Sequence, residues 1–437
     1  MSSLPRPLNI WHPFSQEALD PAPLRVKRAQ GASLYLEDGR RLIDAISSWW
    51  VSIHGHCHPA IMSAIAEQTA KLDHVLLAGF THEPIEELCL RLRAVLPEGL
   101  NHIFFSDNGS TAVEVALKLA AQYWQNAGQP KKTGIVALEH AYHGDTAGAL
   151  SVSDDSSFTD PFRAFRFPVH RVHAAYCYRC PVGKTRATCD IECVDKLAEL
   201  LRAKADEIAA VIVEPLLQGA GGMIMHPAEF LQRVSQLCSE HDVLLIADEV
   251  LTGFGRCGKM FACDVAGVVP DLMCLSKGLS GGAMAMGATV ATDRIHEAFV
   301  STDRSRTFYH GHSYTGNPLA AAAAVASLQV FETEPVFERI AEIEKVHRER
   351  LAAIARHRGV GETRCIGSVA AIELRADDAG YSSNLRPMLY DFFLRAGVLL
   401  RPLGHIVYVL PPFCISPEDL NFVYDRIGEG LDLCVRR

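Results

Sequence analysis

Residues 243–250 read Val-Leu-Leu-Ile-Ala-Asp-Glu-Val, an apolar run that ends in two acidic side chains. An unbroken apolar run of this length predicts a strand that is buried on both faces, as strands of parallel sheets are. Similar runs lie at 103–105, 135–138, 209–213 and 272–275, with helical patterns at 110–124 and 230–240. This alternation predicts an α/β fold in which helices cover both faces of a mainly parallel sheet.

The chain of 437 residues is longer than a usual single domain. Beyond residue 334 the alternation gives way to a mixed α+β pattern. The predicted regions are an N-terminal segment (1–55) that packs with the small domain, a large domain (56–333) and a small C-terminal domain (334–437). Further predicted elements are paired strands within 31–48, helical stretches within 59–96 that break near Gly79, and helices at 317–332 and 340–357.

The composition narrows the class of protein. Apolar residues make up 49% of the chain and charged residues 21%, which is typical of a globular protein. The formal charge of −9 and the lack of a basic run argue against a nucleic-acid partner. Residues 1–8 lack the apolar core of a signal peptide, and no run of ~18 apolar residues predicts a membrane span. The thirteen cysteines mostly stand singly in apolar stretches, as reduced thiols do, so we predict a cytoplasmic protein.

An acid and an amine follow two of the predicted strands. Asp248 ends the first run and Lys277 follows the run at 272–275. Open α/β sheets bind ligands at the carboxyl ends of their strands. A lysine in apolar surroundings has a lowered pKa and is a usable nucleophile. Each residue alone also fits a capping or surface role, but together they predict a pyridoxal phosphate (PLP) enzyme, which needs a lysine for a Schiff base and an acid at the pyridine nitrogen.

Two further stretches suit the same cofactor. At 105–112 a predicted strand passes through Gly109 and Ser110 into a helix. The N–H groups of a helix start and a serine hydroxyl can bind a phosphate, although many helices begin this way without a ligand. Tyr142, in Ala-Tyr-His-Gly-Asp-Thr at 141–146, follows another strand, so its ring could lie against a cofactor ring.

The stretch 248–256, Asp-Glu-Val-Leu-Thr-Gly-Phe-Gly-Arg, followed by Ser-Lys-Gly at 276–278, resembles the signature of class III (ornithine-type) aminotransferases. The resemblance extends over residues 11–430 and implies a fold type I PLP enzyme that works as a homodimer with active sites at the interface. Within the class, the chain is most similar to the branch that converts 8-amino-7-oxononanoate to 7,8-diaminononanoate in biotin biosynthesis. The stretches that carry this similarity are 10–14, 47–50, 54–56, 142–145 and 401–404.

The resemblance assigns roles to individual residues. Lys277 would hold the cofactor and move a proton, Asp248 would pair with the pyridinium nitrogen, and Tyr142 would stack near the cofactor and touch substrate. The residues implied to bind the cofactor phosphate are Gly109 and Ser110, together with His312 and Ser313 from the partner subunit. The residues implied to bind substrate are Phe14, Trp49, Tyr142, Lys277, Gly311 and Arg401, with Trp49 along the apolar chain and Arg401 at the distant carboxylate.

Two departures from the family pattern concern the amino donor. Phe14 stands where the family often has a tyrosine whose hydroxyl orients substrates. Residues 310–313 read His-Gly-His-Ser where His-Gly-Pro-Thr is common, and Ser313 keeps the hydroxyl. A related branch that resembles this chain at both points uses lysine. S-adenosylmethionine remains the predicted donor, because it is the commoner activity in the family, and lysine is the alternative.

Other readings remain open at this stage. Another class III ω-aminotransferase is the first alternative, and a binding module that kept the fold without the reaction is the second. The spacing C-x2-C-x8-C-x3-C at Cys177, Cys180, Cys189 and Cys193 is compatible with structural zinc. A loop of reduced thiols explains the same spacing, and no metal is predicted.

Overall fold

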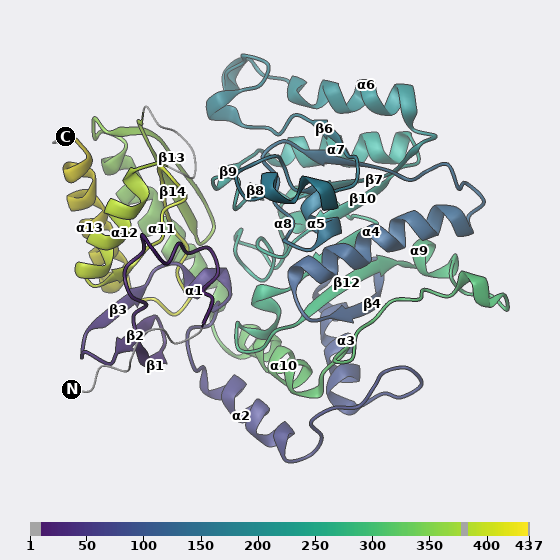
Figure 1. Ribbon diagram of the computed structural model, residues 1–437, viewed down its shortest axis with the longest axis horizontal. Coiled ribbons are helices and arrows are strands. Elements are labelled where there is room, and N and C mark those ends of the chain that lie inside the picture. The colour runs from purple at the N-terminus through teal and green to yellow at the C-terminus, as the bar shows by residue number, and fades with distance from the viewer. Residues whose placement is uncertain (1–9, 377–382, 436–437) are drawn as a thin grey trace.

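The computed structural model describes residues 10–376 and 383–435, so the N-terminal stretch 1–8 and the first part of the predicted segment 1–55 lie outside it. A seven-stranded sheet forms the centre of the larger part of the molecule (Figure 1). Its order is β4 (Leu100–Ser106), β12 (Gly287–Thr292), β11 (Leu272–Leu275), β10 (Leu244–Asp248), β7 (Ile208–Val213), β5 (Gly134–Leu138) and β6 (His170–Val172). All neighbours from β11 to β6 are parallel, and β12 is antiparallel to both of its neighbours. The predicted mainly parallel sheet is confirmed.

Alternate residues of the strands supply two separate hydrophobic cores. On β10, Leu244 and Ile246 belong to the core around α4 (Gly109–Asn126), whereas Leu245 and Ala247 belong to the core on the other face. The second core includes Phe230 of α7 (Ala228–Glu240). Both faces are therefore buried, which explains why β7 and the first four residues of β10 are apolar at successive rather than alternate positions.

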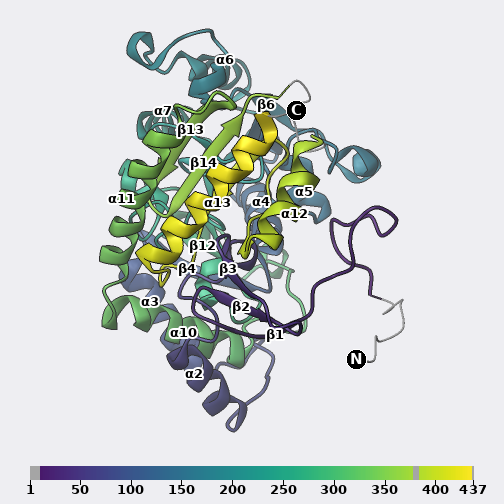
Figure 2. The ribbon, with the colours of Figure 1, turned by 90° about the vertical axis from the view of Figure 1, so that its left-hand side faces the viewer.

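The smaller part of the molecule is an α+β layer (Figure 2). Its antiparallel sheet consists of β13 (Val360–Ile366), β14 (Val369–Leu374) and β16 (Ile406–Val409). The helices of this part are α11 (Val336–Ile354), α12 (Leu385–Arg395) and α13 (Pro417–Val435). The helix predicted at 340–357 thus begins one turn earlier and ends earlier than expected.

The N-terminal strands join the C-terminal part. The sheet of β1 (Val26–Gln30), β2 (Ser33–Leu36) and β3 (Arg41–Asp44) is completed by β15 (Val398–Leu399), which runs parallel to β3. The packing of the whole N-terminal segment 1–55 with the small domain stays a prediction. The boundaries at 55/56 and 333/334 stay predictions; α10 (Pro318–Thr333) ends and α11 begins beside the second of them.

The stretch 59–96 contains two helices, α2 (Pro59–Thr69) and α3 (Glu83–Val95), with Gly79 in the break between them as predicted, and both pack on α10. The paired strands predicted within 31–48 end at Asp44, because the chain enters a left-handed turn at Ser47–Trp50 (α1). Within residues 10–376 and 383–435, no helix is long and apolar enough to cross a bilayer.

Candidate functional site

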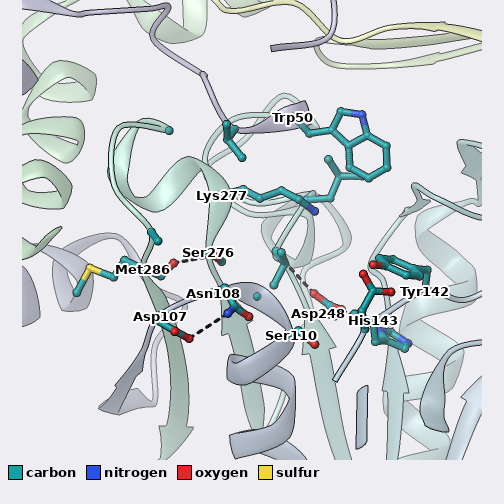
Figure 3. A pocket seen from close by; sticks show the side chains of 18 of the residues that line it. Trp50, Asp107, Asn108, Ser110, Tyr142, His143, Asp248, Ser276, Lys277 and Met286 are labelled. Carbon is teal, nitrogen blue, oxygen red and sulfur yellow. Dashed lines mark hydrogen bonds and ion pairs between the residues drawn. The ribbon is translucent and has the colours of Figure 1, made fainter. Parts of the chain in front are cut away.

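A cavity of ≈ 690 Å³ opens at the carboxyl ends of the parallel strands (Figure 3). It lies where β5, β7, β10 and β11 end and where α4 begins, which is the place that the strand-end rule predicts. Five of the predicted site residues line it, namely Gly109, Ser110, Tyr142, Asp248 and Lys277. Residues from four separate stretches of the sequence therefore meet in one cavity.

Lys277 lies directly after β11 in a strained backbone conformation. Its φ is +41°, which is uncommon for a residue with a side chain, and the preceding Ser276 hydroxyl donates to the carbonyl of Met286 at 2.6 Å. The Nζ atom lies 4.9 Å from the centre of the Trp50 ring. Burial lowers the pKa of the Lys277 amine, while the charges of Asp248 and Glu214 oppose that shift. This environment favours the neutral, nucleophilic amine.

Asp248 ends β10 and is held by two neighbours. One carboxylate oxygen, Oδ2, lies 2.7 Å from His143 Nδ1, and the other accepts the N–H of Val250 at 3.1 Å. Both side chains of the Asp248–His143 pair are buried. Within the part of the chain that the structure describes, His143 Nε2 is buried without a hydrogen-bond partner. His143 and the Val250 N–H therefore fix the position of the Asp248 carboxylate at the cavity (Figure 3).

The next residue, Glu249, serves the fold instead of the cavity. Its carboxylate accepts the backbone N–H groups of Cys263 at 2.7 Å and Ala262 at 3.1 Å, and the hydroxyl of Thr252 at 2.5 Å. Burial raises the pKa of Glu249 to about 7. Successive residues of a strand point to opposite sides, which explains why two adjacent acids have different surroundings.

The start of α4 forms an anion cradle. The Asn108 side chain caps the helix by accepting the N–H of Thr111 at 2.9 Å. The N–H groups of the first helical turn have no acceptor within the helix, so those of Gly109 and Ser110 are available to a phosphate. A Cβ on Gly109 would lie 2.5 Å from Val250 Cγ1, and one on Gly144 would lie 2.3 Å from Ser110 Oγ. The Lys277 amine fits the aldehyde of PLP, the Asp248 carboxylate fits its ring nitrogen, and the N–H groups at the start of α4 fit its phosphate.

Three predicted substrate residues meet in a second group beside the cavity. The Phe14 ring lies edge-on to Trp49, with 5.3 Å between the ring centres, and its other neighbour is Phe158 at 5.8 Å. The Arg401 guanidinium lies 5.0 Å from the centre of the Trp49 ring, and its Nη2 donates to the Phe14 carbonyl at 3.3 Å. None of the three lines the cavity itself; the group is joined to it through the backbone, since Trp50, the next residue after Trp49, does line it.

The structure does not bring Gly311, His312 and Ser313 to the cavity of this chain. They lie in a largely exposed loop, where the neighbouring His310 accepts a hydrogen bond from Lys118 Nζ at 3.0 Å. A contribution to the cavity of the partner subunit requires such an exposed position. Their predicted role stays a prediction.

The cavity is also lined by Trp50, His143 and Glu214, to which no role was assigned from the sequence. Glu214 follows β7 and accepts the N–H groups of Tyr142 and Gly219, each at 3.0 Å. Burial raises the pKa of Glu214 to about 7. The sequence pattern could have identified Glu214, because this acid follows an apolar run, as Asp248 does. Trp50 and His143 stand next to residues that were assigned.

The cysteine-rich stretch forms no disulfide among the described residues. In the same part of the chain, no group of three or more His, Cys, Asp or Glu side chains is arranged to hold a metal ion. Cys177, Cys180, Cys189 and Cys193 are thus free thiols in this structure, and the absence of a metal in the protein stays a prediction.

A family model described as aminotransferase class-III matches residues 14–431. The chain belongs to the class III aminotransferases. Among relatives of this aminotransferase are the adenosylmethionine-8-amino-7-oxononanoate aminotransferases of Synechococcus elongatus, 46% identical over 98% of this chain and 100% of that one, and of Geobacter sulfurreducens, 40% identical over 97% and 95%. The solved enzyme of the same name from Methanocaldococcus jannaschii is 33% identical, with a TM-score of 0.91 over 97% of both chains.

Another similar structure bears on the cofactor. An amine transaminase from an uncultivated Pseudomonas species, solved in its PLP-bound form, is 32% identical and has a TM-score of 0.91 over 98% of this chain and 99% of that one. The cofactor of this class III aminotransferase is PLP, and its fold is fold type I. When bound, PLP acts as an electron sink for the carbanion formed at the substrate carbon.

Proposed function

We propose that this aminotransferase converts 8-amino-7-oxononanoate to 7,8-diaminononanoate in biotin biosynthesis, with S-adenosylmethionine as amino donor. The group of Phe14, Trp49 and Arg401 beside the cavity carries the proposal. Its aromatic rings suit an aliphatic chain, and a guanidinium suits the carboxylate at the far end of that chain. The names of relatives that are 35–46% identical over nearly the whole chain support it.

Each cavity residue would then have its own role in the reaction. Lys277 Nζ would carry the cofactor and, once released, move the proton at the reacting carbon. Asp248, held by His143, would pair with the ring nitrogen and keep it protonated. Gly109 and Ser110 would bind the phosphate through their N–H groups. Tyr142, whose own N–H is fixed by Glu214, would lie beside the ring and touch substrate.

The protein would act as a cytoplasmic homodimer. The loop that carries Gly311, His312 and Ser313 is exposed in the single chain, so the partner subunit's His312 and Ser313 would complete the phosphate site and its Gly311 would meet the substrate. The exposed apolar side chains at Tyr309 and Tyr314 of the same loop support an interface there.

Arg401 provides a test of the substrate assignment. We expect Arg401→Ala to lower kcat/KM for 8-amino-7-oxononanoate by at least about thirtyfold, since losing a charge-assisted contact costs roughly 2–5 kcal/mol. The half-reaction with the amino donor should change much less. Steady-state kinetics with each substrate varied measures both effects. The control is Arg348→Ala, which removes a surface ion pair with Glu344. Equal losses for both substrates would mean that Arg401 supports the structure of the site.

Phe14 provides a test of the donor. Its ring lies between Trp49 and Phe158, and a tyrosine there would add a hydroxyl to the substrate side. One neutral hydrogen bond is worth ~0.5–1.5 kcal/mol, so we expect Phe14→Tyr to change the preference between S-adenosylmethionine and lysine by a few-fold to about tenfold. The half-reaction with the keto substrate should barely change. Phe158→Tyr is the matched control, and donor ratios identical to wild type in Phe14→Tyr would assign Phe14 to packing alone.

The donor half-reaction tests the proposal itself. The yellow holoenzyme is mixed separately with S-adenosylmethionine and with lysine, and the absorbance of the aldehyde form of the cofactor is followed. Loss of that band with S-adenosylmethionine supports the proposed donor, and loss with lysine alone supports the alternative. The similarity to an amine transaminase favours a second candidate function, transfer from simple amines to pyruvate. Turnover of such a pair at a higher kcat/KM than 8-amino-7-oxononanoate would favour that function.

A further inference from the structure

Four consecutive residues between β3 and the cavity have left-handed backbone conformations. The φ values of Ser47, Ser48, Trp49 and Trp50 are +49°, +54°, +116° and +74°. None of the four is a glycine, and a positive φ brings the Cβ of an ordinary residue too close to its own backbone. Such a run persists only where surrounding groups hold it.

The carboxylate of Asp44 holds one end of this turn. Asp44 is fully buried. Its Oδ1 accepts the N–H groups of Ile46 at 3.2 Å and Ser48 at 2.9 Å. Its Oδ2 accepts the Ser48 hydroxyl at 2.8 Å and lies 2.8 Å from Nε2 of His56. His56 is itself fixed by backbone hydrogen bonds with Gly31. One side chain thus satisfies several polar groups that the left-handed turn leaves without a helical or strand partner.

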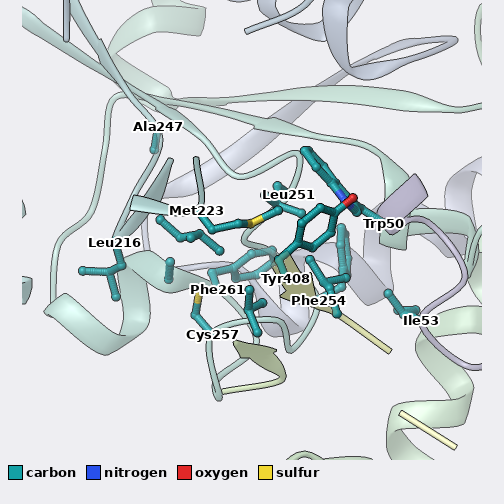
Figure 4. Close-up of a cluster of buried hydrophobic side chains, with 14 of the residues drawn as sticks. Trp50, Ile53, Leu216, Met223, Ala247, Leu251, Phe254, Cys257, Phe261 and Tyr408 are labelled. Carbon is teal, nitrogen blue, oxygen red and sulfur yellow. The ribbon is translucent and has the colours of Figure 1, made fainter. Parts of the chain in front are cut away.

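The other end of the turn is held by different groups. The buried Arg256 donates to the Trp50 carbonyl at 3.4 Å and to the Pro411 carbonyl at 2.8 Å. The Trp50 indole N–H donates to the hydroxyl of Tyr408 at 3.1 Å, and Figure 4 shows the two rings side by side. Burial lowers the pKa of Arg256 to about 9, and the charge of Asp44 opposes that shift. The buried Asp44 carboxylate therefore holds one end of the turn, and the buried Arg256 guanidinium holds the other.

The turn determines where two tryptophans lie. Trp50 faces Lys277 across the cavity, and Trp49 packs against Phe14 and Arg401. We infer that Asp44 is a positioning residue for the reaction: through His56 and the backbone of Ser48 it keeps the turn left-handed and so places Trp50 in the wall of the cavity and Trp49 against Phe14 and Arg401. Asp44 does not line the cavity itself. The identity of the long-chain substrate in this inference rests on the proposed function.

The test compares four variants with a control. Asp44→Ala removes every contact of the carboxylate, whereas Asp44→Asn keeps an oxygen for the two backbone N–H groups and changes the atom that faces His56 and the Ser48 hydroxyl. His56→Ala removes that neighbour, and His56→Gln keeps a donor in its place. The control is Asp271→Asn, which alters another acid that accepts a backbone N–H, from Leu245 at 2.8 Å, remote from the turn.

Two measurements are made on each holoenzyme. The first is kcat/KM for 8-amino-7-oxononanoate and for 3-amino-2-butanone, a short α-amino ketone that lacks the chain and the carboxylate. The second is near-ultraviolet circular dichroism without substrate, which reports how rigidly the four tryptophans, Trp49 and Trp50 among them, are held; the difference between variant and wild type isolates the effect of the substitution. We expect Asp44→Ala to lose at least about tenfold more on the long substrate than on the short one, because small misplacements of positioning groups are costly. The tryptophan signal should weaken, and His56→Gln should recover part of what His56→Ala loses.

Several outcomes would overturn the inference. Equal losses on both substrates, an unchanged tryptophan signal in Asp44→Ala, or the same pattern in Asp271→Asn would reduce Asp44 to a general structural residue. If Asp44→Ala does not fold, Asp44→Asn and the two His56 variants decide by the same criteria. If the wild type does not convert 8-amino-7-oxononanoate at all, the proposed function fails, and the dichroism series still decides whether Asp44 holds the turn.

Discussion

Lys277→Ala is expected to reduce transamination by roughly 10⁴-fold or more, because in the proposed function this one side chain would supply both the covalent attachment of the cofactor and the proton transfer. The measurement is kcat for purified protein saturated with PLP. Lys259→Ala, which removes an exposed lysine of the neighbouring loop, is the control and should keep full activity. Retention of more than a trace of turnover by Lys277→Ala would contradict the assignment of the reacting amine.

The same variant should still fold. Lys277 is buried beside the Trp50 ring, and burying an amine that lacks good partners contributes little to the free energy of folding. We therefore expect thermal unfolding of the cofactor-free protein to change by only a few degrees, which differential scanning calorimetry checks. A collapse of stability would make loss of activity uninformative, and Lys277→Arg would then replace it as the test variant.

Asp248→Asn has the second largest expected effect. Asparagine keeps the size of the side chain and an oxygen for the Val250 N–H, but it removes the negative charge that would pair with the ring nitrogen of the cofactor. We expect kcat to fall well beyond tenfold, that is by more than ~1.4 kcal/mol of activation free energy, while PLP remains bound. Stopped-flow measurement of the donor half-reaction isolates this step.

Glu249→Gln is a matched control for Asp248→Asn, since the two acids are adjacent but only Asp248 lines the cavity. The Glu249 variant should lose stability with little change in the half-reaction rate. A fall of less than tenfold in Asp248→Asn, or an equal fall in both variants, would assign the role at the ring nitrogen to another acid.

The central strands of the large sheet could be predicted from the sequence because an apolar run is a local pattern. β7 is apolar at every position and β10 at every position before Asp248, and helices of 3.6-residue periodicity separate such strands. The prediction missed β12, whose Gly-Ala-Thr-Val-Ala-Thr sequence has small and polar side chains, and the three-residue edge strand β6. Both strands form because neighbouring strands offer hydrogen bonds, which no local pattern reveals.

The residues of the site likewise include some that a local sequence pattern reveals and others that it does not. Asp248 and Lys277 could be found from the residues alone, because strand ends of a parallel sheet meet at one edge. The meeting of Phe14, Trp49 and Arg401 joins positions almost 400 residues apart in sequence, so only the family resemblance pointed to it. The left-handed turn at Ser47–Trp50 could not be predicted, since its residues favour other conformations and its stability comes from Asp44 and Arg256.

The central claim is that this class III aminotransferase acts on 8-amino-7-oxononanoate. The most direct measurement incubates the purified, PLP-loaded protein with that substrate and S-adenosylmethionine, and in parallel with lysine, and detects 7,8-diaminononanoate by mass spectrometry. We expect the diamine to form with S-adenosylmethionine and expect Lys277→Ala to form none. Absence of the diamine with either donor, from a protein that still transfers amino groups from simple amines to pyruvate, would contradict this claim.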